Sequence, residues 1–406
     1  MIKLPEEFLN RMKNVPGLDF EAFLASYDEP SVKGLRFNKK KVRPETVEML
    51  VSEWNLEKIP WSEYGYIYDE SLRPGLSPYH DAGVFYIQDP GAMYPGEVAP
   101  IEATDVVLDL CAAPGGKTTR LCEKAGVVLS NEIIPNRARV LSSNIERMGF
   151  SNDVVSQASP AELSAVFPEF FDCVVVDAPC SGEGMMRKDE TAVEEWSVEN
   201  VELCIRRQKE ILKEAVKMLK PGGTLVYSTC TFEPGENEEH AQWLIDTYGD
   251  FTLVSEKTFY PHLERGEGQY CAVLKRDGEK QPGSVSVRDI ERRLSRSGIH
   301  ILRAGVTEGE TLMDKKKGKI YVPSHAEVMA TVFYDNPFVN ALNIRDLDTA
   351  LEYLKGNVLR TVDDAEYKND KDGFIGVYFD GYPLGLGKKS GNVIKNHYPK
   401  GLRRMN

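Results

Sequence analysis

The sequence has few of the features that mark secreted, disulfide-rich or membrane-spanning proteins. Its 406 residues include only seven cysteines, an odd number without the close spacing of a disulfide scaffold. It has no run of about 18 apolar residues, the length that a transmembrane helix needs. The stretch from Met1 to Glu7 carries acidic side chains and no apolar core, so we expect no signal peptide. These absences predict a cytoplasmic protein with no membrane attachment.

Positive charge is also scarce, because 63 acidic residues outweigh 50 basic ones and leave a net charge of −13. This balance argues weakly against a nucleic-acid partner, although the distribution of charge matters more than the sum. Two stretches are basic. Residues 388–404 contain six Lys and Arg side chains and no acid, and residues 292–303 contain four Arg. Charge alone leaves open whether these clusters contact nucleic acid or only face solvent.

The length of the chain predicts two or three domains, because one hydrophobic core rarely serves so many residues. We expect an N-terminal segment at 1–100, a central domain at 101–278 and a smaller α+β domain at 279–406. A polar, Gly- and Pro-containing stretch at 277–286 suggests the linker between the last two. The C-terminal domain is expected to begin with a strand at 298–303.

Strand-like and helix-like patterns alternate through the central region. Strands are expected at 106–110, 127–130, 154–156, 172–177 and 224–228, and helices at 118–124, 135–148 and 198–219. This alternation predicts an α/β fold, with a parallel sheet covered by helices on both faces. Ligands bind such sheets at the carboxyl ends of their strands.

The turn after the first of these strands has the composition of a ligand-binding loop. Its residues are Cys111, Ala112, Ala113, Pro114, Gly115, Gly116 and Lys117. Small residues let a ligand approach the backbone, and the following helix N-terminus attracts anions. A phosphate-binding loop would need glycine at position 111, and the dinucleotide fingerprint G-x-G-x-x-G is absent. We therefore predict a nucleoside-type cofactor that carries a carboxylate.

Two charged side chains are placed to hold such a cofactor. Lys117 can pair with the carboxylate, and Glu132, just past the next strand, can hold ribose hydroxyls. The alternative for Glu132 is a surface acid that caps a helix. S-adenosyl-L-methionine fits both contacts, and the sequence predicts no metal site.

Two cysteines lie in polar turns just past the carboxyl ends of expected strands. Cys180 follows the strand that ends at Asp177, and Cys230 follows the strand at 224–228. Two thiols with a carboxylate at one sheet edge suggest covalent catalysis. Free cysteines are more often small buried apolar residues. We expect that role for four others, Cys122, Cys173, Cys204 and Cys271.

Three motifs occur in a specific order: residues 111–117, Asp177-Ala178-Pro179-Cys180-Ser181-Gly182, and Ser228-Thr229-Cys230 with Glu236-Asn237-Glu238. In these motifs the chain resembles the Sun/Fmu-type (NOL/NOP/Sun) RNA cytosine-5 methyltransferases. Further stretches, such as 34–36, 182–188 and 395–401, resemble the RsmF branch, which acts on 16S ribosomal RNA. The resemblance implies an N-terminal RNA-binding segment, a Rossmann-like S-adenosylmethionine-dependent core and a C-terminal PUA-like domain.

The resemblance also implies roles for individual residues. It assigns the attack on C6 of cytosine to Cys230, product release to Cys180, and contacts with the pyrimidine edge and the cofactor to Asp177. Ser159 aligns where the family usually has an acid or amide at the adenine end of the cofactor. The residues alone leave the division between the thiols open, because DNA cytosine-5 methyltransferases attack from a motif like Pro179-Cys180. The target base must be single-stranded or flipped out of its helix.

Three hypotheses about function follow. The first is an RNA cytosine-5 methyltransferase that acts as a monomer on 16S ribosomal RNA or the small ribosomal subunit. The second is a DNA cytosine methyltransferase, which the basic N-terminal segment and the PUA-like region disfavour. The third is an RNA-binding assembly factor with an inactive core, which the intact Cys180, Cys230 and Asp177 disfavour.

Overall fold

The computed structural model describes residues 3–280, 283–314, 318–333, 340–360 and 365–404. The linker expected at 277–286 lies partly outside them. The N-terminal part has a four-stranded antiparallel sheet in the order β2-β3-β1-β4. Its elements are α1 (Glu6–Met12), α2 (Phe20–Ala25), β1 (Lys33–Phe37), α3 (Pro44–Glu53), β2 (Glu57–Lys58), β3 (Gly65–Tyr68), α4 (Pro78–Asp81), β4 (Phe85–Ile87) and α5 (Pro90–Val98).

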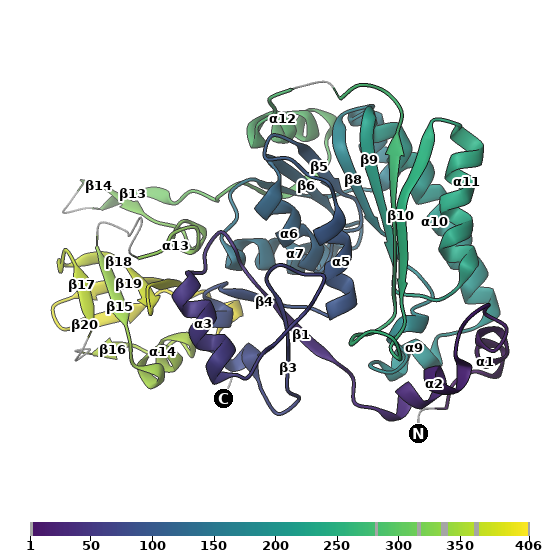
Figure 1. The fold of residues 1–406 in the computed structure, drawn as a ribbon. Helices are drawn as coiled ribbons and strands as arrows, with labels where there is room; N and C mark the ends of the chain where they lie inside the picture. The colour runs from purple at the N-terminus through teal and green to yellow at the C-terminus, as the bar shows by residue number, and fades with distance from the viewer. Residues whose placement is uncertain (1–2, 281–282, 315–317, 334–339, 361–364, 405–406) are drawn as a thin grey trace.

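The central part is built around an eight-stranded sheet in the order β10-β11-β9-β8-β5-β6-β7-β12 (Figure 1). Strands β9, β8, β5, β6 and β7 are parallel, and β10, β11 and β12 are antiparallel additions at the edges. The strands are β5 (Val106–Asp109), β6 (Val127–Asn131), β7 (Asp153–Gln157), β8 (Phe171–Asp177), β9 (Leu219–Thr229), β10 (Phe251–Phe259), β11 (Gln269–Arg276) and β12 (His300–Ala304).

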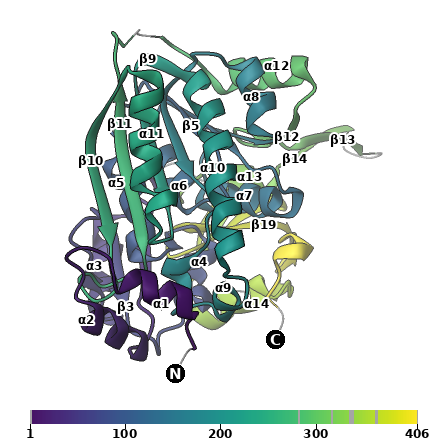
Figure 2. The ribbon, with the colours of Figure 1, turned by 90° about the vertical axis from the view of Figure 1, so that its right-hand side faces the viewer.

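Helices cover both faces of this sheet. They are α5, α6 (Gly116–Lys124), α7 (Pro135–Met148), α8 (Pro160–Val166), α10 (Val198–Met218), α11 (Glu238–Tyr248) and α12 (Val287–Ser297). The short helix α9 (Glu190–Glu194) packs with α1 and α2 instead. Successive side chains of a strand point to opposite faces. Val106 and Leu108 thus pack under α8, α10, α11 and α12, while Val107 packs under α5, α6 and α7. Figure 2 looks onto the face that α10 and α11 cover. The predicted Rossmann-like α/β core is confirmed.

Two details differ from the sequence prediction. Helix α10 ends at Met218 without a loop, because Leu219 already pairs with Phe171 in the sheet. The Pro221-Gly222-Gly223 stretch that follows lies inside β9 rather than in a turn after the helix. There Gly222 has a φ of +73° and the register of β9 with β8 shifts. The strand expected at 298–303 was placed in the C-terminal domain. As β12, it pairs with β7 and extends the central sheet.

The C-terminal part contains a separate hairpin and a six-stranded sheet in the order β16-β20-β19-β18-β15-β17. Its elements are β13 (Glu310–Asp314), β14 (Gly318–Val322), α13 (His325–Met329), β15 (Ala341–Ile344), α14 (Leu347–Leu354), β16 (Leu359–Arg360), β17 (Glu366–Lys368), β18 (Gly373–Phe379), β19 (Tyr382–Ser390) and β20 (Val393–Asn396). Side chains of this sheet share one apolar cluster with β1, α3 and β4. The N-terminal sheet and α3 therefore pack against the C-terminal part on one side of the core, as Figure 1 shows.

Candidate active site

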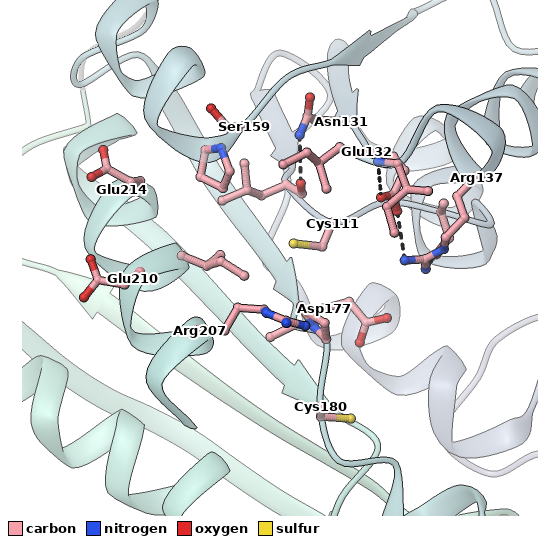
Figure 3. A pocket seen from close by; sticks show the side chains of 18 of the residues that line it. Cys111, Asn131, Glu132, Arg137, Ser159, Asp177, Cys180, Arg207, Glu210 and Glu214 are labelled. Atoms are coloured by element: carbon pink, nitrogen blue, oxygen red, sulfur yellow. Dashed lines mark hydrogen bonds and ion pairs between the residues drawn. The ribbon is translucent and has the colours of Figure 1, made fainter. Parts of the chain in front are cut away.

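A cavity of about 760 Å³ opens at the carboxyl edge of the parallel strands. The loops after β5, β6, β7, β8 and β9 line it together with α10 (Figure 3). Seven residues singled out from the sequence lie in its wall: Cys111, Ala113, Glu132, Ser159, Asp177, Cys180 and Cys230. The structure therefore brings both cysteines, the aspartate and part of the predicted cofactor loop to one site.

The two thiols of the site touch each other. Cys180 Sγ lies 3.1 Å from Cys230 Sγ, and the backbone N–H of Cys230 donates to Cys180 Sγ at 3.3 Å. The hydrogen bond to Cys230, together with burial, raises the pKa of the Cys180 thiol well above its usual range. Cys180 therefore keeps its proton and can donate it to the sulfur of Cys230. The other four cysteines named above are buried and free, as expected.

Hydrogen bonds between distant segments hold the two cysteine loops together. Ser181 Oγ lies 2.8 Å from Thr231 Oγ1, one residue beyond each cysteine. Glu236 Oε2 accepts from the backbone N–H of Ser181 at 3.0 Å and from Gln208 Nε2 at 2.6 Å. Asn237 Nδ2 donates to the carbonyl of Thr231 at 2.9 Å. The Glu236-Asn237 pair of the third motif thus fixes the loops that carry the thiols.

Asp177 is held from both sides at the floor of the site. Lys117 Nζ donates to Asp177 Oδ2 at 2.7 Å, and Ser228 Oγ donates to Oδ1 at 2.8 Å. Burial lowers the pKa of Lys117, but Asp177 more than compensates, so that the net shift is upward. Lys117 is not among the residues in the cavity wall. Its ammonium group contacts the site only indirectly, by its bond to Asp177, which does line the cavity.

The cofactor loop takes its shape from the N-terminal part of the chain. The guanidinium group of Arg36 is fully buried and donates to the carbonyl of Gly116 at 3.1 Å and to Thr119 Oγ1 at 2.7 Å. Tyr86 donates from its hydroxyl to the carbonyl of Pro114 at 3.2 Å. Gly115 has a φ of +111°, which favours glycine. The loop is therefore fixed before any ligand binds.

Asp109, at the end of β5, lies directly beneath this loop. Its Oδ2 accepts from Thr118 Oγ1 at 2.7 Å, whereas Oδ1 is buried without a hydrogen-bond partner among the described residues. Burial raises the pKa of Asp109 to about 7. A neutral Asp109 can still accept the bond from Thr118, which closes the first turn of α6.

At the other end of the cavity, side chains are held by near neighbours in sequence. Glu132 Oε1 accepts from the backbone N–H of Ile134 at 2.9 Å, and Oε2 pairs with Arg137 at 3.2 Å. Glu132 thus makes a helix-start contact, yet its side chain is buried and faces the cavity. Ser159 caps α8, because its hydroxyl donates to Glu162 Oε2 at 2.6 Å and accepts from the Glu162 N–H.

Three charged residues on α10 were missed by the sequence analysis. Arg207, Glu210 and Glu214 line the cavity wall opposite the cofactor loop, as Figure 3 shows. Their spacing of three and four residues places them on one face of the helix. The helical pattern showed the buried face of α10, but gave no sign of which polar residues face the site.

In the two basic stretches, 292–303 and 388–404, some side chains form ion pairs within the protein and others are exposed to solvent. Arg303 is buried and pairs with Glu146 at 3.4 Å, and Lys389 pairs with Asp370 at 2.9 Å. The side chains of Lys395 and Lys400 are exposed. So are the α12 arginines Arg292, Arg293 and Arg296.

Among the described residues, no group of three His, Cys, Asp or Glu side chains has a geometry that could hold a metal ion. Within the same residues, no helix is both long and apolar enough to span a membrane.

Family models match three parts of the chain. Residues 4–90 match the N-terminal domain of 16S rRNA methyltransferase RsmF, residues 98–280 match 16S rRNA methyltransferase RsmB/F, and residues 344–404 match the RsmF PUA domain. Two solved structures from Pyrococcus horikoshii are similar. A methyltransferase homolog protein is 26% identical with a TM-score of 0.60, covering 68% of this chain and 96% of its own. NSun6 with SFG is 21% identical with a TM-score of 0.59, covering 68% and 99%.

Curated relatives match over nearly the full length. Ribosomal RNA small subunit methyltransferase F from Escherichia coli O139:H28 is 31% identical, with 99% of this chain and 97% of the relative covered. The protein of the same name from Vibrio campbellii is 31% identical, with 99% and 98% covered. The family predicted from the motifs is thus confirmed, and this chain belongs to the ribosomal RNA small subunit methyltransferase F (RsmF) family.

Proposed function

We propose that this methyltransferase transfers a methyl group from S-adenosyl-L-methionine to C5 of a cytosine in 16S ribosomal RNA, through a covalent bond between Cys230 and C6. Membership of the family supports ribosomal RNA as the substrate. The observation that carries the chemistry is the pair of thiols 3.1 Å apart in one cavity with Asp177.

C5 of cytosine is too electron-poor to take a methyl group from a sulfonium directly. When Cys230 Sγ adds to C6, C5 becomes an enamine carbon that can attack the methyl group. The raised pKa of Cys180 favours Cys230 as the attacking sulfur, because a thiol that keeps its proton is a poor nucleophile. Asp177, oriented by Lys117 and Ser228, is placed to hydrogen-bond the N3/N4 edge of the base.

Product release needs two further events. The proton on C5 must leave to a base, and the bond between C6 and Cys230 Sγ must break. We assign assistance of this second event to Cys180, whose sulfur lies 3.1 Å from the departing sulfur.

The cavity suits the proposed cofactor. The cofactor would supply an electrophilic methyl group, held by the small residues of the loop at 111–117 and by Glu132. Glu132 keeps its carboxylate in the wall of the cavity, where it can accept from ribose hydroxyls. The hydroxyl of Ser159 is occupied by the cap of α8, so backbone and apolar contacts near Pro160 and Ala161 would serve the adenine end.

Lys395 and Lys400 are exposed at the C-terminal end, and we propose that they contact RNA phosphates. The domain boundaries, the cytoplasmic location and the monomeric state stay predictions.

The function can be tested with radiolabelled S-adenosyl-L-methionine and three substrates: 16S RNA, assembled small subunits and DNA. We expect label in RNA, and bisulfite sequencing should place it at C5 of cytosine. Label in DNA alone would point to the second hypothesis. Cofactor binding without transfer to any substrate would point to an assembly factor.

A further inference from the structure

Glu183 is a fully buried carboxylate three residues after Cys180, and it faces the segment that follows Cys230. Its Oε2 accepts from Thr231 Oγ1 at 3.0 Å and from the backbone N–H of Phe232 at 3.2 Å. The next backbone N–H, that of Gly184, donates to the carbonyl of Cys230 at 2.9 Å. Glu183 and Gly184 together therefore hold the backbone of Cys230 and Phe232 and the side chain of Thr231.

The second oxygen of this carboxylate faces other parts of the chain. Glu183 Oε1 accepts from Trp196 Nε1 at 2.9 Å and lies 2.5 Å from Arg11 Nη2 on α1. Arg11 also pairs with Glu233, in the same loop as Cys230. Hydrogen-bond donors from two segments and the guanidinium group of Arg11, as an ion pair, thus converge on one carboxylate.

The N-terminal helices pack tightly over this carboxylate. Phe8 of α1 meets the ring of Trp196 edge-on at 6.2 Å, and Phe23 of α2 meets Phe232 at 5.5 Å. These residues form one apolar cluster with Met186. Figure 1 shows α1 and α2 beside α9, away from the rest of the N-terminal part. Helix α1 is therefore held where Arg11 can reach Glu183.

Removing the cation from a buried ion pair leaves an uncompensated charge, which is strongly unfavourable. The Cys230 loop is therefore expected to rearrange if either Arg11 or Glu183 is replaced. Small displacements of a reacting group can lower a rate on the order of 100-fold. Glu183 does not line the cavity, so it would act on the reaction only through Cys230.

We propose that Glu183 is a positioning residue for Cys230, and that Arg11 holds its carboxylate in place, so that α1 completes the active site. This inference rests on the proposed role of Cys230.

The first test compares Glu183→Gln with the control Glu267→Gln. Glu267 is equally buried and pairs with Arg187 at 2.9 Å, but its side chain makes no described contact with residues 230–232. We expect both variants to melt at lower temperature. Only Glu183→Gln should lose kcat, by roughly 10- to 100-fold, with KM for the cofactor nearly unchanged. Glu183→Asp, which keeps the charge, should restore part of kcat. Equal loss of kcat in both Gln variants would reduce Glu183 to a stabilising role and overturn the proposal.

A second measurement does not depend on methyl transfer. Iodoacetamide alkylates Cys230, and mass spectrometry of the Cys230 peptide gives the rate as a function of pH. We expect the profile to change in Glu183→Gln and Arg11→Met, but not in Glu267→Gln. An unchanged profile in Glu183→Gln would overturn the positioning role whatever the activity of Cys230→Ala. If instead the profile changes while Cys230→Ala remains active, only the proposed nucleophile is wrong.

The role of Arg11 is tested by a double-mutant cycle. If Arg11 acts through Glu183, Arg11→Met should lower kcat in the natural chain but have little further effect in Glu183→Gln. Additive losses would show that Arg11 acts independently and would remove α1 from the proposal.

Discussion

The two ends of the cavity are held together in different ways. Around Cys180 and Cys230, the contacts join segments about 50 residues apart, such as Ser181 with Thr231. At the Ser159 end, the side chains of Ser159 and Glu132 are held by residues two to five positions away, as in the cap that links Ser159 to Glu162. Asn131 joins this end across the sheet through its bonds to the backbone of Ala158. The contacts that position the thiols therefore require the assembled sheet, whereas the cap formed by Ser159 can form with a single helix.

This difference matches what each end must do. A covalent step needs the reacting sulfur at a fixed position, and long-range hydrogen bonds to rigid elements supply that. Cofactor binding spreads over many contacts, so each can be local and modest. Changes at the thiol end should therefore act on methyl transfer, whereas a change of Ser159, whose hydroxyl only caps α8, should act mainly on local stability.

The largest effect is expected for Cys230→Ala, at the thiol end. Methyl transfer should fall on the order of 1,000-fold or more, because the nucleophile is lost. Cofactor affinity, measured by calorimetry, should persist. Cys204→Ala serves as a control, since Cys204 is buried in α10 and does not line the cavity. Near-normal turnover of Cys230→Ala would mean that another group attacks the base.

Lys117→Met tests whether Lys117 orients Asp177 or binds the carboxylate of the cofactor. Its ammonium group bonds Asp177, so its loss should leave Asp177 misdirected and lower kcat by roughly 10- to 100-fold, corresponding to the loss of a charged hydrogen bond of about 1.5–3 kcal/mol. The measurement is kcat at saturating cofactor together with the cofactor Kd. A loss confined to the Kd would place Lys117 on the cofactor carboxylate, as first predicted from the sequence.

Asp109→Asn should change how stability depends on pH. The folded-state pKa of Asp109, about 7, lies above its ordinary value of 3.8. The stabilisation from this group is therefore complete below pH 4 and is lost as pH rises to about 7. Between pH 5 and 7, the unfolding free energy of the natural chain therefore includes a loss of about 2 kcal/mol from Asp109. The variant should lack this loss.

Asp153 qualifies this measurement, because burial also raises its pKa to about 7. Asp89, whose pKa burial raises to about 6, and His80 and His240, whose pKa values burial lowers to about 3 and about 4, also contribute to the slope in both chains. The prediction is therefore the difference in slope between the two chains, which isolates Asp109. A slope equal to that of the natural chain would show that Asp109 is ionised throughout this range.

The smallest effect is expected for Ser159→Ala. Loss of the cap of α8 should lower stability by about 1 kcal/mol. Cofactor affinity should change by less than about twofold, because the hydroxyl already bonds Glu162. Thermal unfolding and calorimetry on the same variant measure both quantities. A marked loss of cofactor affinity at normal stability would show that Ser159 is a cofactor ligand. The two ends of the cavity would then not differ as proposed.

Local patterns predicted much of this molecule. Helix α7 was placed correctly because Pro135 begins it and Gly149 follows its end with a φ of +79°. The cysteine loops were found because each follows a β-branched run. The small residues at 111–117 predicted the cofactor loop, and the family motifs assigned the roles of the two cysteines.

What could not be predicted depends on the assembled fold. No sequence signal shows that Arg36, 80 residues away, donates to the carbonyl of Gly116. The pairing of β12 with β7 was missed because β12 follows the linker, and a short, half-buried strand carries no sequence pattern that identifies the strand it pairs with. Contacts of this kind depend on which elements the sheet order places side by side.

The central claim is that Cys230 forms the bond to RNA and that Cys180 helps to break it. It is tested most directly by Cys180→Ala incubated with 16S RNA and S-adenosyl-L-methionine, followed by denaturing electrophoresis and mass spectrometry of the crosslinked peptide. The account predicts a covalent protein–RNA species attached through Cys230, which is absent when both cysteines are replaced. A trapped species in Cys230→Ala attached through Cys180 would contradict it, because the two thiols would then have exchanged roles.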